Sequence, residues 1–509
     1  MKFHTSILES FHMRAVLALL SAGLMICALP APDIGWLAWI ALVPLMIACD
    51  GVGPLRAAGI GFVSGFAAAF GIYNWMYQLP AFGWRHALVL ATYVAFYPTL
   101  WCAALAIFNR WRAPLIFTAP ALSVVVEYLR ANAGFLALPW GTLAHAQHDN
   151  LPILQIASIA GEHGVIFLVA LGNAAIASVI LSRAWRGARM AALVIVSAHA
   201  WGAYVLYTER PGPMIRVAAI QPNIQIAERA SKQGTALSFK RLEQLTKSAA
   251  TSQPALIVWP ESAVAGNLLA DRSMVATLQS LTQTVGAPII VGAAEVQKFS
   301  TGERQLTMRS HVFNSAFLMQ PGAALSEPYR KRRLLPFGEY FPWEKFITWP
   351  EWLAPRVSEM TPGENAHLFQ LSNGLKIGAL ICWENLFAHL ARESVASGAQ
   401  LLVQLTNDVW FGNTAAPLQH NLASILRAVE NRVPVVIASN TGPSQIIDAY
   451  GRLVAGVPDI FSEGKAVGEI STGGGSAVYS IVGDYFVLVI VSGLAFRVGF
   501  GLMTERVRM

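Results

Sequence analysis

The first 210 residues consist of long hydrophobic stretches that carry almost no charge. Because a helix needs about 20 apolar residues to cross a bilayer, each stretch is a candidate membrane helix. The charge-free windows cover residues 15–32, 34–49, 57–84, 87–109, 113–126, 164–182 and 190–208. The second and fifth windows are short, so their helices must include flanking residues or lie obliquely. The pattern predicts a membrane domain at 1–210 with seven transmembrane helices, and an eighth helix at 479–503.

Between these hydrophobic regions, residues 213–470 alternate short Val/Ile/Leu runs with amphipathic stretches. The short runs predict strands at 215–221, 255–259, 288–292, 315–319, 376–381, 399–405, 434–439 and 444–448. The amphipathic stretches predict helices at 235–252, 271–285, 386–397 and 417–431. This alternation favours a layered α/β domain that is long enough to bury its own core. A glycine run at 473–475 predicts a linker into the last helix.

The composition supports a membrane protein. The chain has 509 residues, of which 55% are hydrophobic and 13% are charged, against about 25% charged residues in soluble domains. Its net charge of +7 does not require nucleic acid as a partner, because much of the excess is arginine beside hydrophobic segments. The first window also resembles a signal peptide, but a second hydrophobic segment follows at once, which favours an uncleaved helix.

The positions of arginine in the loops predict the orientation of the chain. With the N-terminus inside, the cytoplasmic loops carry Arg56, Arg110, Arg112, Arg183, Arg186 and Arg189, whereas the opposite loops carry only Arg85 and Arg130. The positive-inside rule therefore places the N-terminus in the cytoplasm. Seven crossings leave the domain at 213–470 exported, and the eighth returns the chain to a cytoplasmic end with Arg506 and Arg508.

Four polar residues inside the hydrophobic segments have two interpretations. Glu127, Glu162, His163 and His199 either line a cavity or occupy packing and interface positions. Because the sequence offers no evident partner for them, packing is the preferred interpretation.

Cys382 is the one cysteine of the polar domain; the other three, Cys27, Cys49 and Cys102, lie in the hydrophobic segments. It ends the apolar run at 376–381 and is followed by Trp383 and Glu384, which indicates a buried strand that carries a thiol at its carboxyl end. Most free cysteines are simply small buried side chains. An unpaired thiol in an oxidising compartment is a liability unless it is used, which favours a nucleophile.

Two other sites carry reactive side chains. Glu261 follows an apolar run that ends in Trp-Pro, and Lys331 lies eight residues before Glu339. A cysteine nucleophile needs a base and a positive group for the oxyanion, which a glutamate and a lysine provide. Each residue also has a simpler interpretation: a helix-terminal acid for Glu261, a solvated basic patch for Lys331 and a turn residue for Glu339. Spacing alone cannot bring these side chains together.

The sequence shows no Gly-Lys-Ser/Thr phosphate loop, no Gly-x-Gly-x-x-Gly after a strand and no His/Cys cluster with metal spacing. We therefore expect neither a metal nor an organic cofactor.

Three blocks resemble the signatures of the nitrilase (carbon–nitrogen hydrolase) superfamily. They are Trp259-Pro-Glu261, then Tyr329-Arg-Lys331 with Leu335-Pro-Phe-Gly-Glu339, and Cys382-Trp-Glu384. Together with eight membrane helices and the block Thr406-Asn-Asp-Val-Trp410-Phe411-Gly, the whole chain resembles the apolipoprotein N-acyltransferase family. Trp383 stands where that family more often has tyrosine, so only the fine shape of the pocket differs.

This resemblance implies an αββα sandwich with a catalytic triad of Glu261, Lys331 and Cys382. By analogy, Glu261 takes the thiol proton and Lys331 stabilises the tetrahedral intermediate. The backbone N–H of Trp383 completes the oxyanion hole, and Glu339 and Glu384 are supporting carboxylates. A lysine beside the thiol is also expected to lower the pKa of Cys382.

The reaction implied by the resemblance is a ping-pong acyl transfer at the bacterial inner membrane, with the catalytic domain in the periplasm. Cys382 takes an acyl chain from a phospholipid, phosphatidylethanolamine by expectation, and passes it to the N-terminal diacylglyceryl-cysteine of an apolipoprotein. The partners are therefore two lipids and the bilayer, without nucleic acid, and we expect a monomer. A lipid-facing pocket would keep water from the thioester.

An aromatic, proline-broken stretch at 340–354 follows Glu339 directly. Because Trp and Tyr favour the membrane interface, it predicts an arm that guides acyl chains, with Trp349 and Trp352 in the arm and Trp410 and Phe411 at the same entrance. The alternative is a buried surface loop.

Three other functions remain open from the sequence. A membrane-bound nitrilase-type amidase would share the triad but would not need eight helices. A transporter is disfavoured because the hydrophobic segments show no set of paired charges. A catalytically inactive lipid-binding scaffold is disfavoured by the presence of all three triad residue types.

Overall fold

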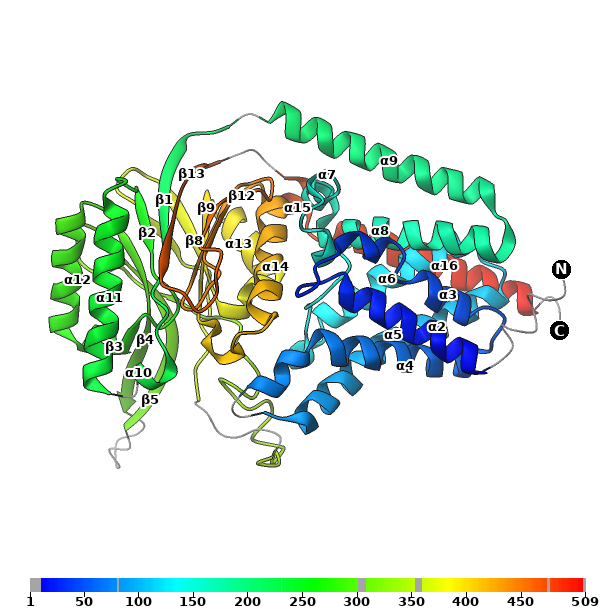
Figure 1. The fold of residues 1–509 in the computed structure, drawn as a ribbon, viewed down its shortest axis with the longest axis horizontal. Helices are drawn as coiled ribbons and strands as arrows, with labels where there is room; N and C mark the ends of the chain where they lie inside the picture. Colours follow the sequence, from blue (N-terminus) through cyan, green and yellow to red (C-terminus); the bar gives the residue numbers. More distant parts are fainter. Residues whose placement is uncertain are drawn as a thin grey trace. The chain divides into compact units, whose positions relative to one another are not determined.

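The structure, a computed structural model of the 509-residue chain, describes residues 11–79, 82–209, 211–229, 231–300, 308–352, 359–473 and 477–506. Residues 474–475 of the expected linker, 353–354 of the expected arm and Arg508 lie outside this range. The chain forms two compact units (Figure 1), and each is described by itself. The first unit holds Met1–Glu209, Thr414–Gln419 and Ala477–Met509, and the second holds Arg210–Asn413 and His420–Ser476.

The first unit is helical. Its α-helices are α2 (Phe11–Cys27), α3 (Val43–Ala48), α4 (Pro54–Ile72), α5 (Trp84–Arg110), α6 (Leu115–Ala131), α7 (Leu151–Leu154), α8 (Ala157–Ser182), α9 (Trp185–Thr208), α15 (Val478–Val482) and α16 (Tyr485–Arg506). Glycines let α4 approach α5 closely, because a Cβ on Gly65 would lie 2.8 Å from Pro98 Cγ. Among the described residues, four helices are long and apolar enough to cross a membrane: α4, α5, α8 and α9.

This number is smaller than the eight crossings expected from the sequence. The window at 34–49 breaks into the 3-10 helix η1 (Gly35–Trp39) and the short α3, which has Pro44 in its first turn. Helix α6 has only 17 residues and contains Glu127 and Arg130. Helix α2 and the apolar part of α16 are also shorter than 18 residues. Length and composition alone therefore identify four crossings.

The second unit contains two β-sheets. The first has the order β13-β1-β2-β4-β5-β6, with β3 on β4: β1 (Met214–Gln221), β2 (Leu256–Val258), β3 (Val264–Asn267), β4 (Ile289–Ser300), β5 (Met308–Met319), β6 (Tyr329–Arg330) and β13 (Gly464–Ser471). The second has the order β12-β11-β10-β9-β8-β7: β7 (Leu368–Gln370), β8 (Lys376–Ile381), β9 (Leu401–Thr406), β10 (Val435–Ser439), β11 (Gln445–Ile447) and β12 (Leu453–Gly456). Strands β1, β2 and β4 run parallel to one another, as do β8, β9 and β10.

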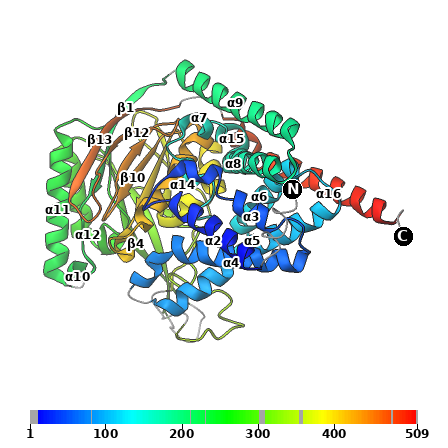
Figure 2. The same ribbon diagram turned by 45° about the vertical axis from the view of Figure 1, so that its right-hand side comes forward.

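Helices cover the outer faces of both sheets, so the unit is an αββα sandwich (Figures 1 and 2). Helices α11 (Lys232–Ala250) and α12 (Arg272–Val285) cover the first sheet, and α13 (Ala388–Ala396) and α14 (Ala416–Asn431) cover the second. A short helix, α10 (Ile226–Arg229), precedes α11. Helix α12 begins where Asp271 Oδ1 accepts a hydrogen bond from Met274 N at 3.0 Å, and it ends at Gly286, whose φ is +68°.

Strand β8 shows how the sequence pattern produces the layers. Ile377, Ala379 and Ile381 point into the core between the two sheets, because alternate side chains of a strand face opposite sides. Gly378 faces outward, where a Cβ would lie 2.8 Å from Ser394 Cβ of α13. The alternation fixes the strand's register and leaves Cys382 directly beyond its end.

Each of the eight strands and four helices expected for this unit overlaps an observed element. Five strands were missed: β3, β6, β7, β12 and β13. Most of these are two to four residues long, and β13 contains two glycines, so none presents a clear alternating apolar pattern.

Candidate active site

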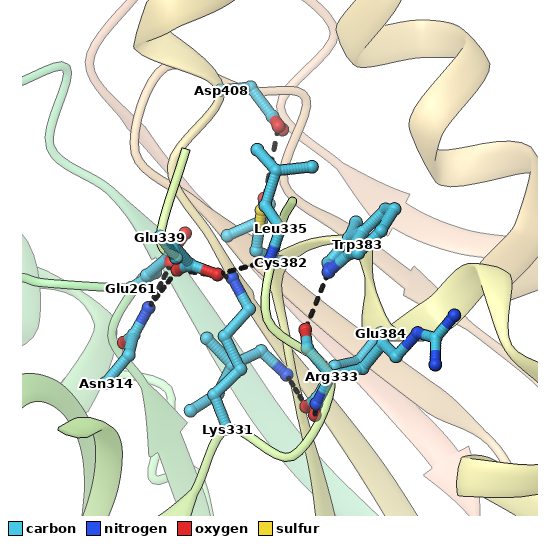
Figure 3. A network of polar contacts seen from close by, with 12 residues as sticks. Glu261, Asn314, Lys331, Arg333, Leu335, Glu339, Cys382, Trp383, Glu384 and Asp408 are labelled. Atoms are coloured by element: carbon cyan, nitrogen blue, oxygen red, sulfur yellow. Dashed lines mark hydrogen bonds and ion pairs between the residues drawn. The ribbon is translucent and has the colours of Figure 1, made fainter. Parts of the chain in front are cut away.

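The candidate nucleophile and the candidate base follow strands of the two facing sheets. Cys382 comes directly after β8, and Glu261 comes three residues after β2 ends at Val258. Parallel strands present their carboxyl ends at one edge of a sheet, where ligands bind in α/β folds. Figure 3 shows that the side chains of Glu261, Lys331, Glu339 and Cys382 converge. The structure thus brings together residues that the sequence places up to 121 positions apart.

Cys382 adopts an unusual backbone conformation. Its φ is +54°, in the left-handed region that residues with a Cβ occupy only at a cost of about 1–3 kcal/mol. The turn is held by Glu384, whose Oε2 accepts a hydrogen bond from Ile381 N at 2.8 Å. The thiol is half-buried. A strained turn that exposes a reactive side chain is a recurrent feature of active sites.

Lys331 is the central charge of the cluster. It follows the two-residue strand β6 and is only 1% exposed. Its Nζ donates a hydrogen bond to Glu339 Oε1 at 2.8 Å and lies 3.8 Å from Glu261 Oε1. Leu335 N in turn donates to Glu339 Oε2 at 2.7 Å. The lysine predicted as a solvated patch in the simpler interpretation is therefore a buried, paired cation.

Asn314 on β5 joins the two carboxylates. Its Nδ2 donates to Glu261 Oε1 at 2.6 Å and lies 3.3 Å from Glu339 Oε1, and its backbone oxygen accepts from Lys331 N at 2.8 Å. Asn314 is not among the site residues predicted from the sequence. The available signal was an amide directly before the apolar run at 315–319 that predicted the strand.

Glu384 connects the cysteine turn to the lysine segment. The side chain is fully buried. Its Oε1 accepts from the backbone N–H groups of Arg332 at 2.7 Å and Arg333 at 3.0 Å, and its Oε2 accepts from Tyr329 Oη at 2.8 Å in addition to Ile381 N. Four donors on one buried carboxylate satisfy its hydrogen-bonding capacity. This geometry fits a residue that positions both Cys382 and Lys331.

Trp383 also ties the cysteine turn to the lysine segment. Its Nε1 donates to Arg333 O at 2.6 Å, and its ring packs edge-on against Phe387 with centroids 5.1 Å apart. The indole is buried. Its side chain is thus fixed, which holds the peptide that follows Cys382 in place.

Asp408 is a further buried acid near the thiol, labelled in Figure 3. It accepts hydrogen bonds from Thr406 Oγ1 at 3.1 Å and Ser439 Oγ at 3.3 Å, and it pairs with His420 Nδ1 at 3.0 Å. The motif at 406–412 pointed to this region, but its sequence interpretation singled out only the two aromatic residues. Charge and position make Asp408 part of the electrostatic environment of Cys382.

The environment keeps the resting thiol protonated. Burial, followed by the negative charge of Glu261, raises the pKa of Cys382 well above its usual value, and the opposing effect of Lys331 is smaller. The lowering effect expected of Lys331 is present, but burial and the carboxylates, which the sequence could not weigh, outweigh it. Burial also raises the pKa of Glu261, although Lys331 opposes this. A more basic Glu261 suits a group that takes the thiol proton during the reaction.

Lys331 stays charged in this setting. Burial alone would lower its pKa, but Cys382 in its thiolate form and the carboxylates of Glu339 and Glu261 outweigh burial and raise the pKa of Lys331. A permanent ammonium has three N–H donors. Glu339 takes one of them by hydrogen bond and Glu261 lies at ion-pair distance, so a donor remains for an oxyanion that forms beside the sulfur.

The expected arm leaves the cluster at Glu339 and is described as far as residue 352. Trp349 is half-buried: its ring packs edge-on against Phe337 at 4.9 Å, and its Nε1 donates to Pro342 O at 2.7 Å. Phe346 and Trp352, in contrast, are 87% and 51% exposed. The loop thus combines an internal anchor with exposed aromatic side chains.

The two residues expected at the same entrance, Trp410 and Phe411, belong to the 3-10 helix η7 (Asp408–Phe411). Trp410 is exposed and Phe411 is partly exposed. Asp408 begins the same 3-10 helix, so this turn links the aromatic pair to the electrostatic environment of the thiol.

Only one group among the described residues has a spacing that suits a metal ion. Asp33, His148 and Asp149 of the first unit have ligand atoms within 4.8 Å of one another, and the two carboxylates are exposed. Pairing of His148 with each aspartate, at 3.4 Å, accounts for this arrangement without an ion. The group contains no residue of the predicted triad.

Both parts of the chain match models of known protein families. Residues 216–478 match the carbon-nitrogen hydrolase family model, and residues 21–175 match the model of the apolipoprotein N-acyltransferase N-terminal domain. Among solved structures, an amidase from Nesterenkonia sp. aligns with a TM-score of 0.36 at 18% identity, covering 52% of this chain and 93% of its own. Nit3 from Saccharomyces cerevisiae aligns with a TM-score of 0.38 at 19% identity, covering 51% and 91%.

Relatives also match over almost the whole length. The apolipoprotein N-acyltransferase of Geobacter metallireducens is 33% identical over 501 residues, which cover 94% of each chain. That of Rhizobium meliloti is 27% identical and covers 95% of this chain and 97% of its own. The similarity therefore includes the helical unit as well as the αββα unit.

Proposed function

Because the chain belongs to the apolipoprotein N-acyltransferase family, we propose that it transfers a fatty acyl group from a phospholipid, through a thioester on Cys382, to the N-terminal amine of a lipoprotein. The acceptor is the diacylglyceryl-cysteine of an apolipoprotein, and the expected donor is phosphatidylethanolamine. The observation that carries the proposal is the position of the buried Lys331 beside Cys382, whose backbone φ is positive. Lys331 Nζ lies 2.8 Å from Glu339 Oε1 and 3.8 Å from Glu261 Oε1.

The first half-reaction forms the thioester. Glu261 takes the proton of the Cys382 thiol as the sulfur attacks the ester carbonyl of the phospholipid. Lys331 Nζ and the backbone N–H of Trp383 stabilise the oxyanion of the tetrahedral intermediate. When the intermediate collapses, the C–O bond breaks and Glu261 returns its proton to the leaving oxygen, so a lysophospholipid departs. Glu339 and Glu384 hold the lysine and the turn in place throughout.

The second half-reaction consumes the thioester. The α-amine of the acceptor attacks the acyl carbonyl, the same two donors stabilise the oxyanion, and the C–S bond breaks. The amine loses a proton to Glu261, which passes it to the departing sulfur. An amide replaces a thioester, and the enzyme returns to its starting state. In each half-reaction Glu261 thus accepts one proton and gives it to the leaving group. Both half-reactions balance without an added redox group.

The membrane setting fits lipid substrates. Four long apolar helices support a membrane protein, and the arginine distribution supports eight crossings with the αββα unit outside the cytoplasm. In this topology the shorter helices α2, α6 and α16, and the broken segment at 34–49, provide the remaining crossings. We propose a monomer in the bacterial inner membrane with its catalytic unit in the periplasm.

The direct test is intact mass spectrometry of the purified full-length protein incubated with phosphatidylethanolamine and no acceptor. The expected result is a hydroxylamine-sensitive fatty-acyl adduct on Cys382, with release of lysophospholipid, which is absent in Cys382→Ala and strongly reduced in Glu261→Gln. The matched control is Glu243→Gln on α11, which removes a partly exposed carboxylate that pairs with Lys247. Transfer of the adduct to a diacylglyceryl-cysteine peptide would establish the second half-reaction.

The same experiment separates acyl transfer from amide hydrolysis. A protein that forms no adduct with any phospholipid but hydrolyses small amides would be a membrane-bound amidase, and the proposal would be wrong. An adduct that is lost only to water would contradict the acceptor part of the proposal.

A further inference from the structure

The first unit contains a cavity of about 130 Å³ that has no part in the proposed chemistry. Residues of α2, α3, α4, α5 and α6 line it, together with Leu42, Trp140, Gly141 and Leu143. A single water needs about 10–15 Å³, and an apolar cavity of about 150 Å³ is known to admit benzene. The space is therefore large enough for part of an organic ligand.

Two charged residues line the cavity. Glu127 and Arg130 lie one turn apart on α6, and Arg130 Nη2 is 2.6 Å from Glu127 Oε2. The arginine side chain is 7% exposed and the glutamate side chain 22%. Within the described ranges, Arg130 Nε has no hydrogen-bond acceptor. Of the two interpretations of Glu127 from the sequence, the structure supports the cavity-lining one.

A buried ion pair with an unsatisfied donor is costly in a membrane segment. Removing charges from water is repaid only when the geometry is good and the remaining hydrogen-bonding groups find partners. Here Tyr73, whose Oη donates to Trp140 O at 2.9 Å, is the neighbouring polar side chain of the lining. The charged pair therefore retains capacity for a polar ligand, and an intramembrane ion pair is a functional-site candidate.

The remainder of the lining is mainly apolar. On α6 the lining runs from Ser123 to Arg130, and on α4 it runs from Ser64 to Ile72. At about 1.5 Å per residue these runs correspond to lengths of roughly 10–12 Å. Ala68 and Leu45 are among the apolar side chains of the wall. A charged pair in an otherwise hydrocarbon-like wall matches an amphiphile better than a wholly polar solute.

We propose that this cavity binds a lipid with a phosphoethanolamine head group. The phosphate pairs with Arg130, the ammonium pairs with Glu127, and the adjoining hydrocarbon lies along the apolar wall. A zwitterionic head group satisfies both members of the ion pair without leaving a net charge behind. The residues that line the cavity belong to the first unit and include none of those assigned to the chemistry, so lipid binding there is a proposal independent of the proposed function.

Photocrosslinking tests the location of the ligand. Full-length Cys382→Ala protein in nanodiscs is incubated with phosphatidylethanolamine that carries a diazirine near the head-group end of one acyl chain, or with the corresponding lysophospholipid. After irradiation, the crosslinked peptides are identified by mass spectrometry. We expect labelled residues of α4 and α6 that line the cavity, and the two probes distinguish an intact phospholipid from its lyso form. Labels confined to the outer surface of the helices would overturn the proposal.

Substitutions then test the chemistry of recognition. Ala68→Phe, which fills the wall, and the double variant Glu127→Gln/Arg130→Gln, which removes both charges, should each reduce cavity labelling at least tenfold. The control Ala192→Phe places the same side chain at an exposed position of α9 and should leave labelling unchanged. A phosphatidylglycerol probe, which lacks the amine, should label less than the phosphoethanolamine probe. Equal labelling by the two probes, or normal labelling of folded Ala68→Phe, contradicts the proposal.

The thioester assay keeps this proposal distinct from the proposed function. Cavity variants in the Cys382 background are assayed for the acyl adduct, and their melting temperatures are compared with that of Ala192→Phe. Absent cavity labelling with a normal thioester overturns only the lipid site. Normal cavity labelling without any thioester overturns only the acyl-transfer mechanism.

Discussion

The ionic cluster around Lys331 and the aromatic loop that follows it meet at Glu339 but are built in opposite ways. In the cluster, Lys331 is 1% exposed and its partners Glu261 and Glu339 are themselves held by Asn314. In the loop at 340–352, Trp349 forms an internal anchor while Phe346 is 87% exposed. One region is fixed by buried hydrogen bonds, and the other presents apolar surface.

This difference indicates different roles for the two regions. A fixed, desolvated set of charges stabilises a transition state at little reorganisation cost. Exposed tryptophan and phenylalanine side chains instead favour the membrane interface, where acyl chains are found. We therefore expect substitutions in the cluster to lower the acylation rate even at saturating donor. Substitutions in the loop should instead raise the donor concentration needed for half-maximal acylation.

The largest effect is expected from Lys331→Met. This variant removes the proposed oxyanion donor and leaves two buried carboxylates without their cation, so thioester formation should slow by about 100-fold to 1,000-fold or more. The measurement is single-turnover acylation at saturating donor, followed by intact mass. The control is Lys345→Met in the exposed part of the loop, which should acylate at the wild-type rate. A near-normal single-turnover rate in Lys331→Met would remove the lysine from the mechanism.

A smaller but still large effect is expected from Glu384→Gln. The glutamine amide has only one acceptor oxygen, so its NH₂ group would face backbone N–H donors that the carboxylate now accepts. Leaving such buried donors unpaired costs about 1–3 kcal/mol, so both the melting temperature and the acylation rate should fall.

The control for this variant is Glu393→Gln, because Glu393 is a half-exposed partner of Arg332 and its loss should have little effect. Unchanged stability together with unchanged acylation in Glu384→Gln would show that Glu384 does not position the cysteine turn.

A moderate effect is expected in the pH dependence of acylation. Burial raises the pKa of Glu261, and only the ionised carboxylate accepts the thiol proton. The rate should therefore fall as the pH drops through this raised pKa, at a higher pH than for an ordinary glutamate near 4.3. Asn314→Leu removes a hydrogen bond that lowers the pKa of Glu261. The acid limb of the pH–rate profile, where the rate falls as the pH drops, should therefore move to higher pH.

The control for the pH profile is Asn373→Leu at an exposed position, which should leave the acid limb in place. An acid limb that stays at the wild-type pH in Asn314→Leu would show that Glu261 is not the titrating base.

The sequence was more informative about the cluster than about its surroundings. Apolar runs that end at Cys382 and just before Glu261 predicted strands whose carboxyl ends carry reactive groups, and the structure has strands there. The sequence could not show that Asn314 and Asp408 belong to the same environment, because their contacts join residues that are far apart in the chain. The sequence also could not show that burial and the carboxylates outweigh the effect of Lys331 on the thiol pKa, because burial is a property of the packed structure.

In the helical unit, hydropathy located the apolar segments but not their internal breaks. The window at 34–49 was expected to form one crossing helix, yet it divides into η1 and α3. Glu127 was without an evident partner in the sequence, although Arg130 lies one turn later on the same helix face. Apolar length is therefore a good guide to membrane segments and a poor guide to the polar contacts inside them.

The smallest effect is expected in the loop, where it also tests the division of work most sharply. Trp352→Ser removes an exposed indole, so it should raise the donor concentration needed for half-maximal acylation about fivefold, equivalent to roughly 1 kcal/mol, and leave the maximal single-turnover rate nearly unchanged. Trp349→Ser should also weaken donor capture, and it should additionally loosen the loop because it removes the contact with Phe337 and the hydrogen bond to Pro342 O. The control, Leu237→Ser on α11, removes an exposed apolar side chain of the outer helix layer and should change neither quantity. If Trp352→Ser lowered the maximal rate as much as it weakened capture, the exposed loop would belong to the chemical site, and the contrast between a fixed cluster and a lipid-capturing loop would fail.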